Sequence, residues 1–199
     1  MGNLVRWAIG PPYVVLLLAL ATLPARADFD AGSAAARAGD YATALREWRP
    51  LAEQGHRDAQ FNLGLLYENG LGVAEDGAEA ARWYRLAAEQ NDRTAQAYLA
   101  EMYAQGLGVE RDDREALHWY RGAAERGHAA AQYNVGLFYA TGRGIAPSDV
   151  QAVAWITVAE ENGAAKSELL GTLTRHMSAA SLREATRLVE DVRRQCRVP

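Results

Sequence analysis

The histidines are the residues of this chain that most readily suggest chemistry, because an imidazole can bind a metal ion or act as a general base. The chain has four of them, His56, His118, His128 and His176. No two lie four residues apart, the spacing that would place two imidazoles on one helix face for zinc. His56 and His128 occupy the same position of a repeated unit, where Asp92 stands in the unit between them. We therefore interpret both as residues of a surface turn and predict no metal site.

Pairs of acidic residues could supply a general acid and a general base. Asp76 and Glu79, and again Asp112 and Glu115, lie three residues apart at the predicted start of a helix. That spacing is typical of a capping box, in which the first side chain accepts hydrogen bonds from backbone N–H groups and the second reaches back. Capping accounts for these acids without acid–base work, and we predict no catalytic residue.

Two further features could suggest a bound group. Gly70-Leu71-Gly72 follows a predicted helix, whereas a dinucleotide-binding loop follows a strand. Cys196 is the only cysteine, which excludes an internal disulfide framework. We expect a semi-exposed thiol on the last helix, with an intermolecular disulfide as the alternative in an oxidising compartment. The sequence therefore predicts no cofactor.

The composition favours a single helical domain. Of 199 residues, 49% are hydrophobic and 23% are charged, which provides enough apolar side chains for a core. Alanine is abundant and only 6 residues are proline, as suits a helical protein. The formal net charge is −4. A weakly acidic chain is not expected to bind nucleic acid by neutralising phosphates.

Residues 1–27 have the order of features of a secretory signal peptide. A basic start is followed by the apolar run Tyr13–Leu23 and by Ala25-Arg26-Ala27, the Ala-x-Ala arrangement of a cleavage site. We expect cleavage after Ala27, a periplasmic or secreted protein, and no membrane contact by the mature chain. The alternative is a retained membrane anchor, although Gly10-Pro11-Pro12 interrupts its uncharged stretch.

A period of 36 residues organises the rest of the chain. Residues 57–92, 93–128 and 129–164 align without a gap. The register recovers several series, among them Gln60, Gln96 and Gln132; Tyr67, Tyr103 and Tyr139; Gly72, Gly108 and Gly144; and Trp83, Trp119 and Trp155. So many coincidences at one spacing indicate true structural repeats.

Each repeat predicts two helices. The first runs roughly over 59–68 and places Ala59, Leu63 and Tyr67 on one face. It ends at Gly70, a residue that can take the left-handed conformation that closes a helix. The second begins at the capping box and runs to about Glu89, with alanines and aromatic residues on its buried face.

The flanks predict shorter helices. A pair is hinged at Ala38–Tyr41 in the N-terminal flank. In the C-terminal flank we expect one helix over Lys166–His176 and a last one opened by a capping box at Ser181–Glu184. The last helix has one apolar and one basic face, which suits a lid over the end of the repeat stack.

The repeats resemble those of the Sel-one-like repeat (SLR) family, a relative of the tetratricopeptide repeat (TPR). The residues that carry the resemblance in the first block are Ala59, Leu63, Gly64, Tyr67, Gly70, Gly72, Val73, Ala80, Trp83, Tyr84, Ala87, Ala88 and Glu89. Ala100 and Ile156 depart from the pattern without changing its apolar character. Some secreted members of the family carry a disulfide in every repeat, and this chain lacks all of those cysteines.

The resemblance implies an all-α fold, a right-handed α-solenoid of antiparallel helix pairs whose first helices line a concave groove. The expected organisation is a signal peptide at 1–27, a TPR-like helix pair at 28–56, repeats at 57–92, 93–128 and 129–164, and capping helices at 165–199. The groove residues implied by the fold are Phe61, Leu65, Glu68, Asn69, Glu101, Gln105, Tyr133 and Leu137.

Members of the family are generally adaptors or scaffolds. Together with the signal-peptide features and the missing catalytic residue sets, the resemblance favours a non-catalytic module of the bacterial cell envelope that binds a protein or peptide in its groove. An alternative is a cell-envelope enzyme that acts on peptidoglycan or β-lactams. A serine β-lactam site would need a Ser-x-x-Lys pair, and the sequence has none. A third alternative is a membrane-tethered assembly factor, which requires the N-terminal segment to be retained.

Overall fold

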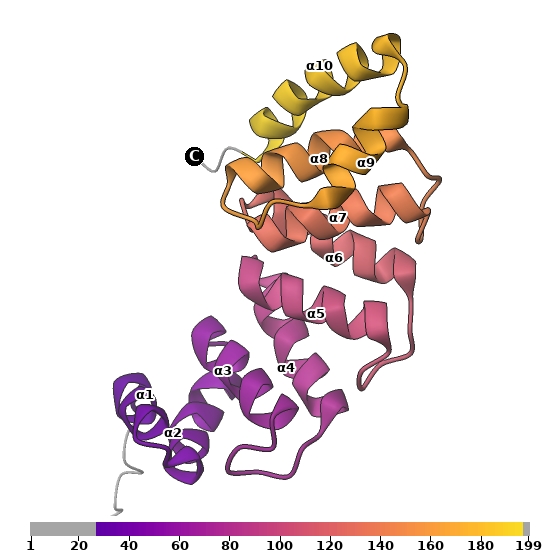
Figure 1. The fold of residues 1–199 in the computed structure, drawn as a ribbon. Coiled ribbons are helices and arrows are strands. Elements are labelled where there is room, and N and C mark those ends of the chain that lie inside the picture. Colours follow the sequence, from indigo (N-terminus) through magenta and orange to yellow (C-terminus); the bar gives the residue numbers. More distant parts are fainter. Residues whose placement is uncertain (1–26, 197–199) are drawn as a thin grey trace, which may run out of the picture.

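The computed structural model describes residues 27–196, and this part of the chain folds into helices only, without a strand. The predicted signal peptide falls almost entirely outside the described residues. The helices follow one another in a curved row from α1 to α10 (Figure 1). Their bounds are α1 Phe29–Arg37, α2 Tyr41–Glu53, α3 Arg57–Glu68, α4 Gly77–Glu89, α5 Arg93–Gln105, α6 Asp113–Glu125, α7 Ala129–Thr141, α8 Asp149–Glu161, α9 Glu168–His176 and α10 Ala179–Gln195. The predicted all-α solenoid is confirmed.

The helices pack in two alternating ways. The first helix of each repeat packs on the second helix of the same repeat, as α3 does on α4. Each second helix also packs on the first helix of the next repeat, as α4 does on α5. Each repeat therefore packs mainly on the repeats before and after it, which is the arrangement of a solenoid. Within 27–196 no helix is both long and apolar enough to cross a bilayer.

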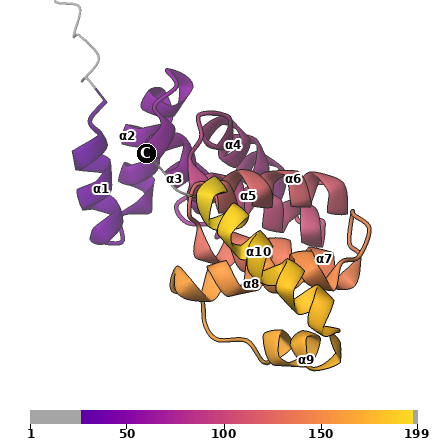
Figure 2. The same ribbon diagram turned by 90° about the horizontal axis from the view of Figure 1, so that it is seen from above.

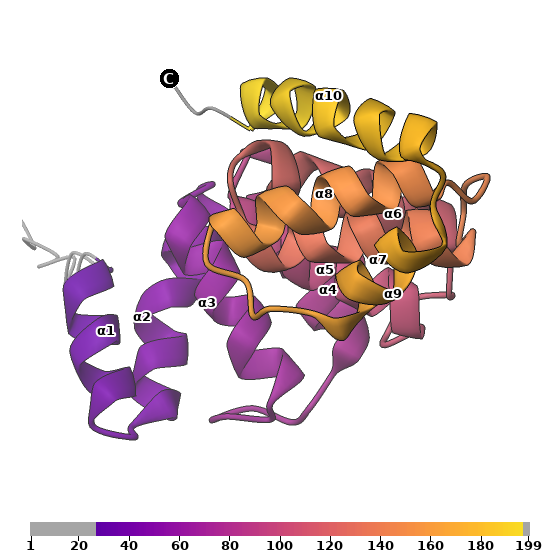
Figure 3. The ribbon, with the colours of Figure 1, turned by 45° about the horizontal axis from the view of Figure 1, so that its top comes forward.

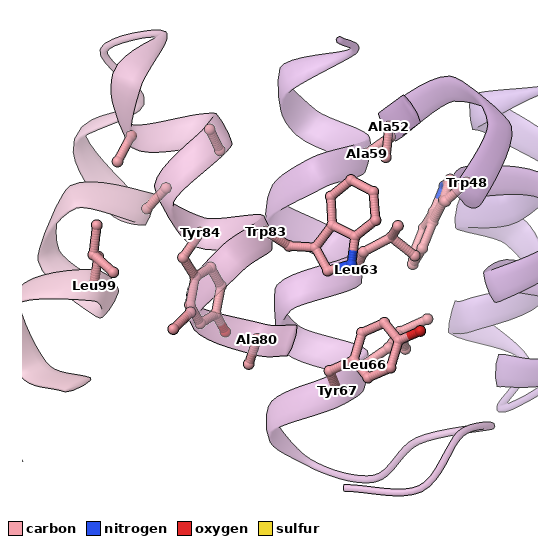
Figure 4. Close-up of a cluster of buried hydrophobic side chains, with 14 of the residues drawn as sticks. Trp48, Ala52, Ala59, Leu63, Leu66, Tyr67, Ala80, Trp83, Tyr84 and Leu99 are labelled. Carbon is pink, nitrogen blue, oxygen red and sulfur yellow. The ribbon is translucent and has the colours of Figure 1, made fainter. Parts of the chain in front are cut away.

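The core of each repeat is built from its large aromatic side chain and the small residues around it. Figure 4 shows Trp83 of α4 beside Leu63 of α3, with Tyr84 turned toward Leu99 of the next repeat. Leu63, Tyr84 and Leu99 are fully buried, and Trp83 is almost so. Alanine and glycine allow the helices to approach closely enough for these rings to fill the remaining space. Burial of such side chains is the main stabilising term of the stack.

A series of arginine–tyrosine hydrogen bonds joins consecutive repeats. Arg49 on α2 donates to the hydroxyl of Tyr67 on α3 over 2.6 Å. In the same register Arg85 donates to the hydroxyl of Tyr103. The third bond of the series runs from Arg121 on α6 to Tyr139 on α7. These bonds repeat with the 36-residue period and cross the boundary between repeats each time.

The predicted capping boxes form only in part. The Asp76 carboxylate accepts from the N–H groups of Ala78 and Glu79, both over 3.0 Å, as expected. Its own N–H, however, donates to the carbonyl of Tyr67 over 2.9 Å, and Glu79 pairs with Arg82. The reciprocal half of the box is therefore wrong, because the end of the first helix already supplies the acceptor. Asp112 and Ser148 repeat this pattern with the carbonyls of Tyr103 and Tyr139.

The loop between the two helices of a repeat presses a glycine against the preceding repeat. Gly72 has a φ of 68°, and a Cβ at this position would lie 2.6 Å from the backbone carbon of Tyr41. Gly108 contacts the backbone of Gly77 in the same way, and Gly144 contacts that of Asp113. Each loop therefore rests directly on the start of the preceding second helix, where only glycine fits.

The C-terminal helices leave the repeat pattern. Helix α9 begins at Glu168 with Ser167 as its N-cap and makes little contact with α8. Helix α10 instead packs along α8, as Figures 2 and 3 show. It begins at Ala179, and Ser178 caps it by accepting from the N–H of Ser181. The predicted capping box at Ser181–Glu184 is therefore wrong by one turn.

We expect Gly136→Ala to destabilise the protein by about 1–3 kcal/mol, the usual cost of overpacking a tight contact. A Cβ at position 136 would lie 2.6 Å from Ile156 Cγ1 and 3.1 Å from the carbonyl oxygen of Ala152 on the facing helix. Urea unfolding followed by circular dichroism measures the change. Gly171→Ala is the matched control, since nothing lies within 4 Å of its Cβ position and alanine favours a helix. Equal stability of the two variants would contradict this account of α7–α8 packing.

Candidate functional site

The residues predicted to line the groove come from α3, α5 and α7. Phe61, Leu65 and Glu68 lie on α3, and Asn69 directly follows it. Glu101 and Gln105 lie on α5, and Tyr133 and Leu137 lie on α7. Asn69 and Gln105 are exposed, whereas the other six are partly buried.

Two of these residues, Glu68 and Glu101, meet in one cavity. A cavity of about 220 Å³ lies between the first helices of the three repeats, and both Glu68 and Glu101 line it. Phe61 does not line this cavity, although its ring lies against that of Tyr98. Leu65 packs into the repeat core, and the Asn69 amide donates to the Leu65 carbonyl over 2.9 Å at the end of its helix. The other lining residues are Ala97, Tyr98, Met102, Leu107, Tyr120, His128, Ala130, Ala131 and Asn134.

The apolar surface of this cavity comes mainly from residues that sequence analysis missed. Tyr98 is 38% exposed and Leu107 is 46% exposed, unusually high values for large apolar side chains in this structure. The ring of Tyr98 lies 5.5 Å from Phe61 and 5.2 Å from Tyr84, measured between ring centroids. A signal was present in the sequence, since Tyr98 stands where the other repeats have Asn62 and Asn134.

Each carboxylate of the cavity is held by a buried tyrosine of the following helix. The Tyr84 hydroxyl donates to Glu68 Oε2 over 2.6 Å. Tyr120 donates to Glu101 Oε2, and the Gln105 amide donates to the other oxygen of Glu101. Burial and the adjacent carboxylate raise the pKa of both tyrosines far above the ordinary value, so they remain neutral donors. The carboxylates are thereby fixed in position.

Glu68 and Glu101 have no ion-pair partner in the described part of the chain, although Arg143 lies near enough to Glu101 to interact with it electrostatically. No arginine or lysine within residues 27–196 forms an ion pair with Glu68 or Glu101. Arg143, in the loop after α7, is instead held by Asp113 and by the Ala104 carbonyl. The cavity therefore combines apolar walls with two negative charges.

A second hollow of about 370 Å³ adjoins the first. Ala130 lines both, and Tyr133 and Lys166 line the second one. The hydroxyls of Tyr133 and Ser167 lie 3.3 Å apart. Both hollows open on the side of the first helices, and together their lining residues extend from Glu68 to the loop before α9. We call this surface the groove.

A further hollow of about 700 Å³ lies outside the groove and is lined mainly by α6. It opens at Gly122, where the other repeats have Leu86 and Val158. Gln96 lies beneath Gly122, and its Oε1 has no hydrogen-bond partner within 27–196. The middle repeat therefore departs from the others here as well as in the groove.

The histidines that sequence analysis assigned to surface turns act as helix N-caps. His56 Nδ1 accepts from the N–H of Ala59, and His128 Nδ1 accepts from the N–H of Ala131, each over 3.2 Å. Asp92 caps α5 at the corresponding position. Burial, together with the nearby Arg93, lowers the pKa of His128, which favours the neutral imidazole that can accept this bond.

A stack of helix pairs with a groove along its first helices defines an α-solenoid repeat protein. The family model of the Sel1 repeat matches residues 57–92, 94–128 and 129–163. These matches cover more than half of the chain, and the protein belongs to the Sel1 repeat family.

Two solved structures are similar to this chain. A Sel1 repeat protein from Oxalobacter formigenes is 37% identical, with a TM-score of 0.57, over 66% of this chain and 97% of that one. The second is c5321, a protective antigen present in uropathogenic Escherichia coli strains and displaying an SLR fold. It is 26% identical, with a TM-score of 0.54, over 84% of this chain and 45% of that one. The search of curated proteins found no match.

We expect the stability of the protein to fall more steeply below neutral pH than that of the variant His128→Asn. Because the pKa of His128 is lowered in the folded state, the unfolded chain binds a proton more readily. The contribution of neutral His128 to the free energy of unfolding is complete above the ordinary histidine pKa of about 6.5. It is lost as the pH falls through the lower pKa that His128 has in the folded protein. Asparagine caps helices without titrating. Thermal unfolding of both proteins at pH 7.5 and pH 5.5 gives the loss of melting temperature between these two pH values. An equal loss in the two proteins would exclude this role of His128.

Proposed function

We propose that this protein is a non-catalytic interaction module of the bacterial cell envelope that holds a peptide or protein segment in the groove across α3, α5 and α7. Sel1 repeat proteins are generally protein-interaction modules, and this coarser function follows from the family. The observation that carries the finer proposal is the cavity where exposed Tyr98 and Leu107 lie beside the carboxylates of Glu68 and Glu101. Exposed aromatic residues in a concave site are typical anchors of protein interfaces.

The groove suits an extended ligand better than a compact one. It crosses three first helices, and its two hollows meet at Ala130. A ligand that spans both would contact every repeat and would gain affinity from several small contacts instead of one deep pocket. The envelope location rests on the signal-peptide features of residues 1–27.

We expect Tyr98→Asn to reduce capture of the partner at least tenfold in affinity purification from the envelope fraction, read by mass spectrometry. Loss of an aromatic anchor at the centre of an interface costs about 2 kcal/mol or more. Asparagine is the residue of the other two repeats at this position, so the substitution suits the fold.

His118→Ala serves as the surface control, because His118 is exposed on α6 and lines the hollow outside the groove. Capture that survives in Tyr98→Asn but is lost in His118→Ala would move the binding site to that hollow. Turnover of peptidoglycan or a β-lactam by the purified protein would overturn the non-catalytic assignment.

We also expect the exported protein to lack residues 1–27. Intact-mass measurement on protein recovered from the periplasm or medium gives the N-terminus directly, and a mass that begins at Asp28 supports export with cleavage. A full-length mass in the membrane fraction would favour the tethered assembly factor instead.

A further inference from the structure

The two carboxylates of the groove are not part of the repeat pattern. Glu68 occupies a position where the other repeats have Ala104 and Ala140. Glu101 occupies a different position, where the other repeats have leucines. Repeats of this chain therefore fold with apolar residues at both places. Two acids from unrelated register positions nevertheless line one cavity.

The hydrogen bonds of the two tyrosines do not by themselves require charge. A phenol hydroxyl needs one acceptor, which a neutral amide could supply as well as a carboxylate. Each glutamate is partly buried and has no ion-pair partner within 27–196, which is unfavourable for an ion. Arg143 lies near Glu101, but its guanidinium is paired with Asp113. Two acids placed side by side in an apolar cavity without an ion-pair partner point to a positive group supplied from outside the described residues.

The walls of the cavity suit the stem of a long basic side chain. Tyr98 and Leu107 present exposed apolar surface beside the carboxylates, and Met102 and Tyr120 complete the wall. Lysine and arginine pack their methylene groups on such surface while the charged end reaches a polar partner. An aromatic ring beside the charge adds a cation–π attraction. A volume of about 220 Å³ accommodates one side chain of this size, not a folded domain.

We propose that this cavity binds a lysine or arginine side chain of an extended peptide segment of the partner, with Glu68 and Glu101 as its counter-ions. The inference rests on the proposed function, since it names the chemistry recognised in the same groove. Glu68 and Glu101 are specificity-determining residues, whereas Tyr84 and Tyr120 are positioning residues that fix the carboxylates. Apolar and acidic segments are the competing occupants.

Binding of four blocked pentapeptides, Ala-Leu-X-Leu-Ala with lysine, arginine, norleucine or glutamate at X, tests the proposal. The protein as recovered after export is titrated with each peptide and followed by NMR, which detects millimolar affinity. We expect the lysine and arginine peptides to shift the amide signals of Ala97 and Tyr98 and to bind at least tenfold more tightly than the norleucine and glutamate peptides. Norleucine is the critical comparison because it keeps the apolar stem without the charge.

The double variant Glu68→Gln/Glu101→Gln should lose this preference, since it removes both charges and keeps an acceptor for each tyrosine. Glu89→Gln/Glu125→Gln is the charge-matched control. Both of its residues are exposed and line the hollow outside the groove, and the preference should persist there. If the control variant also loses its preference for the lysine and arginine peptides, the preference reflects the net charge of the protein and not this cavity. That result would overturn the proposal.

The outcomes separate this inference from the proposed function. If norleucine binds as tightly as lysine, or if the glutamate peptide binds best, the groove still binds peptides but does not select a cation. If no peptide shifts the groove amides, the inference fails. Capture by the Tyr98→Asn variant then decides, on its own, whether the groove binds a partner at all.

Discussion

The structure depends on the close approach of one loop glycine to the preceding repeat. Gly72, Gly108 and Gly144 each rest on the backbone at the start of an earlier second helix, and a Cβ on Gly108 would lie 2.0 Å from the Gly77 carbonyl carbon. This contact leaves no room for a side chain, so it sets the distance between consecutive repeats within narrow limits. The spacing of α3, α5 and α7 follows, and with it the meeting of Glu68 and Glu101 in one cavity.

Most of the fold could be predicted from the sequence because residues 36 positions apart have the same type and the same structural role in each repeat. Leu63 and Trp83 are buried as their spacing predicts. The wrong predictions concern which of two nearby groups accepts a hydrogen bond or caps a helix. The N–H of Asp76 bonds to the Tyr67 carbonyl instead of to Glu79, because the path of the loop brings that carbonyl close. Helix α10 is capped by Ser178 and begins at Ala179, because the packing of α10 on α8 favours the earlier of the two serines as its cap.

The groove was less predictable than the fold because a ligand site depends on departures from the repeat. We predicted the groove residues from the positions of the first helix that face the groove in this fold, and this identified Glu68 and Glu101. It missed Tyr98, which replaces the asparagine of the other repeats. The middle repeat also carries Gly122 in place of a larger apolar residue. Glu68 of the first repeat is a departure of the same kind, since the other two repeats have alanine at its position.

The arginine–tyrosine bonds between repeats have a consequence for the length of the molecule. The next arginine of the series would stand at position 157, but Thr157 is found there and its hydroxyl bonds to Val153 within α8. Helix α8 thus has no arginine at this position to donate to a following repeat. Helix α10 also occupies the face of α8 on which the first helix of a following repeat would pack. A further repeat after α8 would therefore find neither the arginine that joins the other repeats nor a free face of α8 on which to pack.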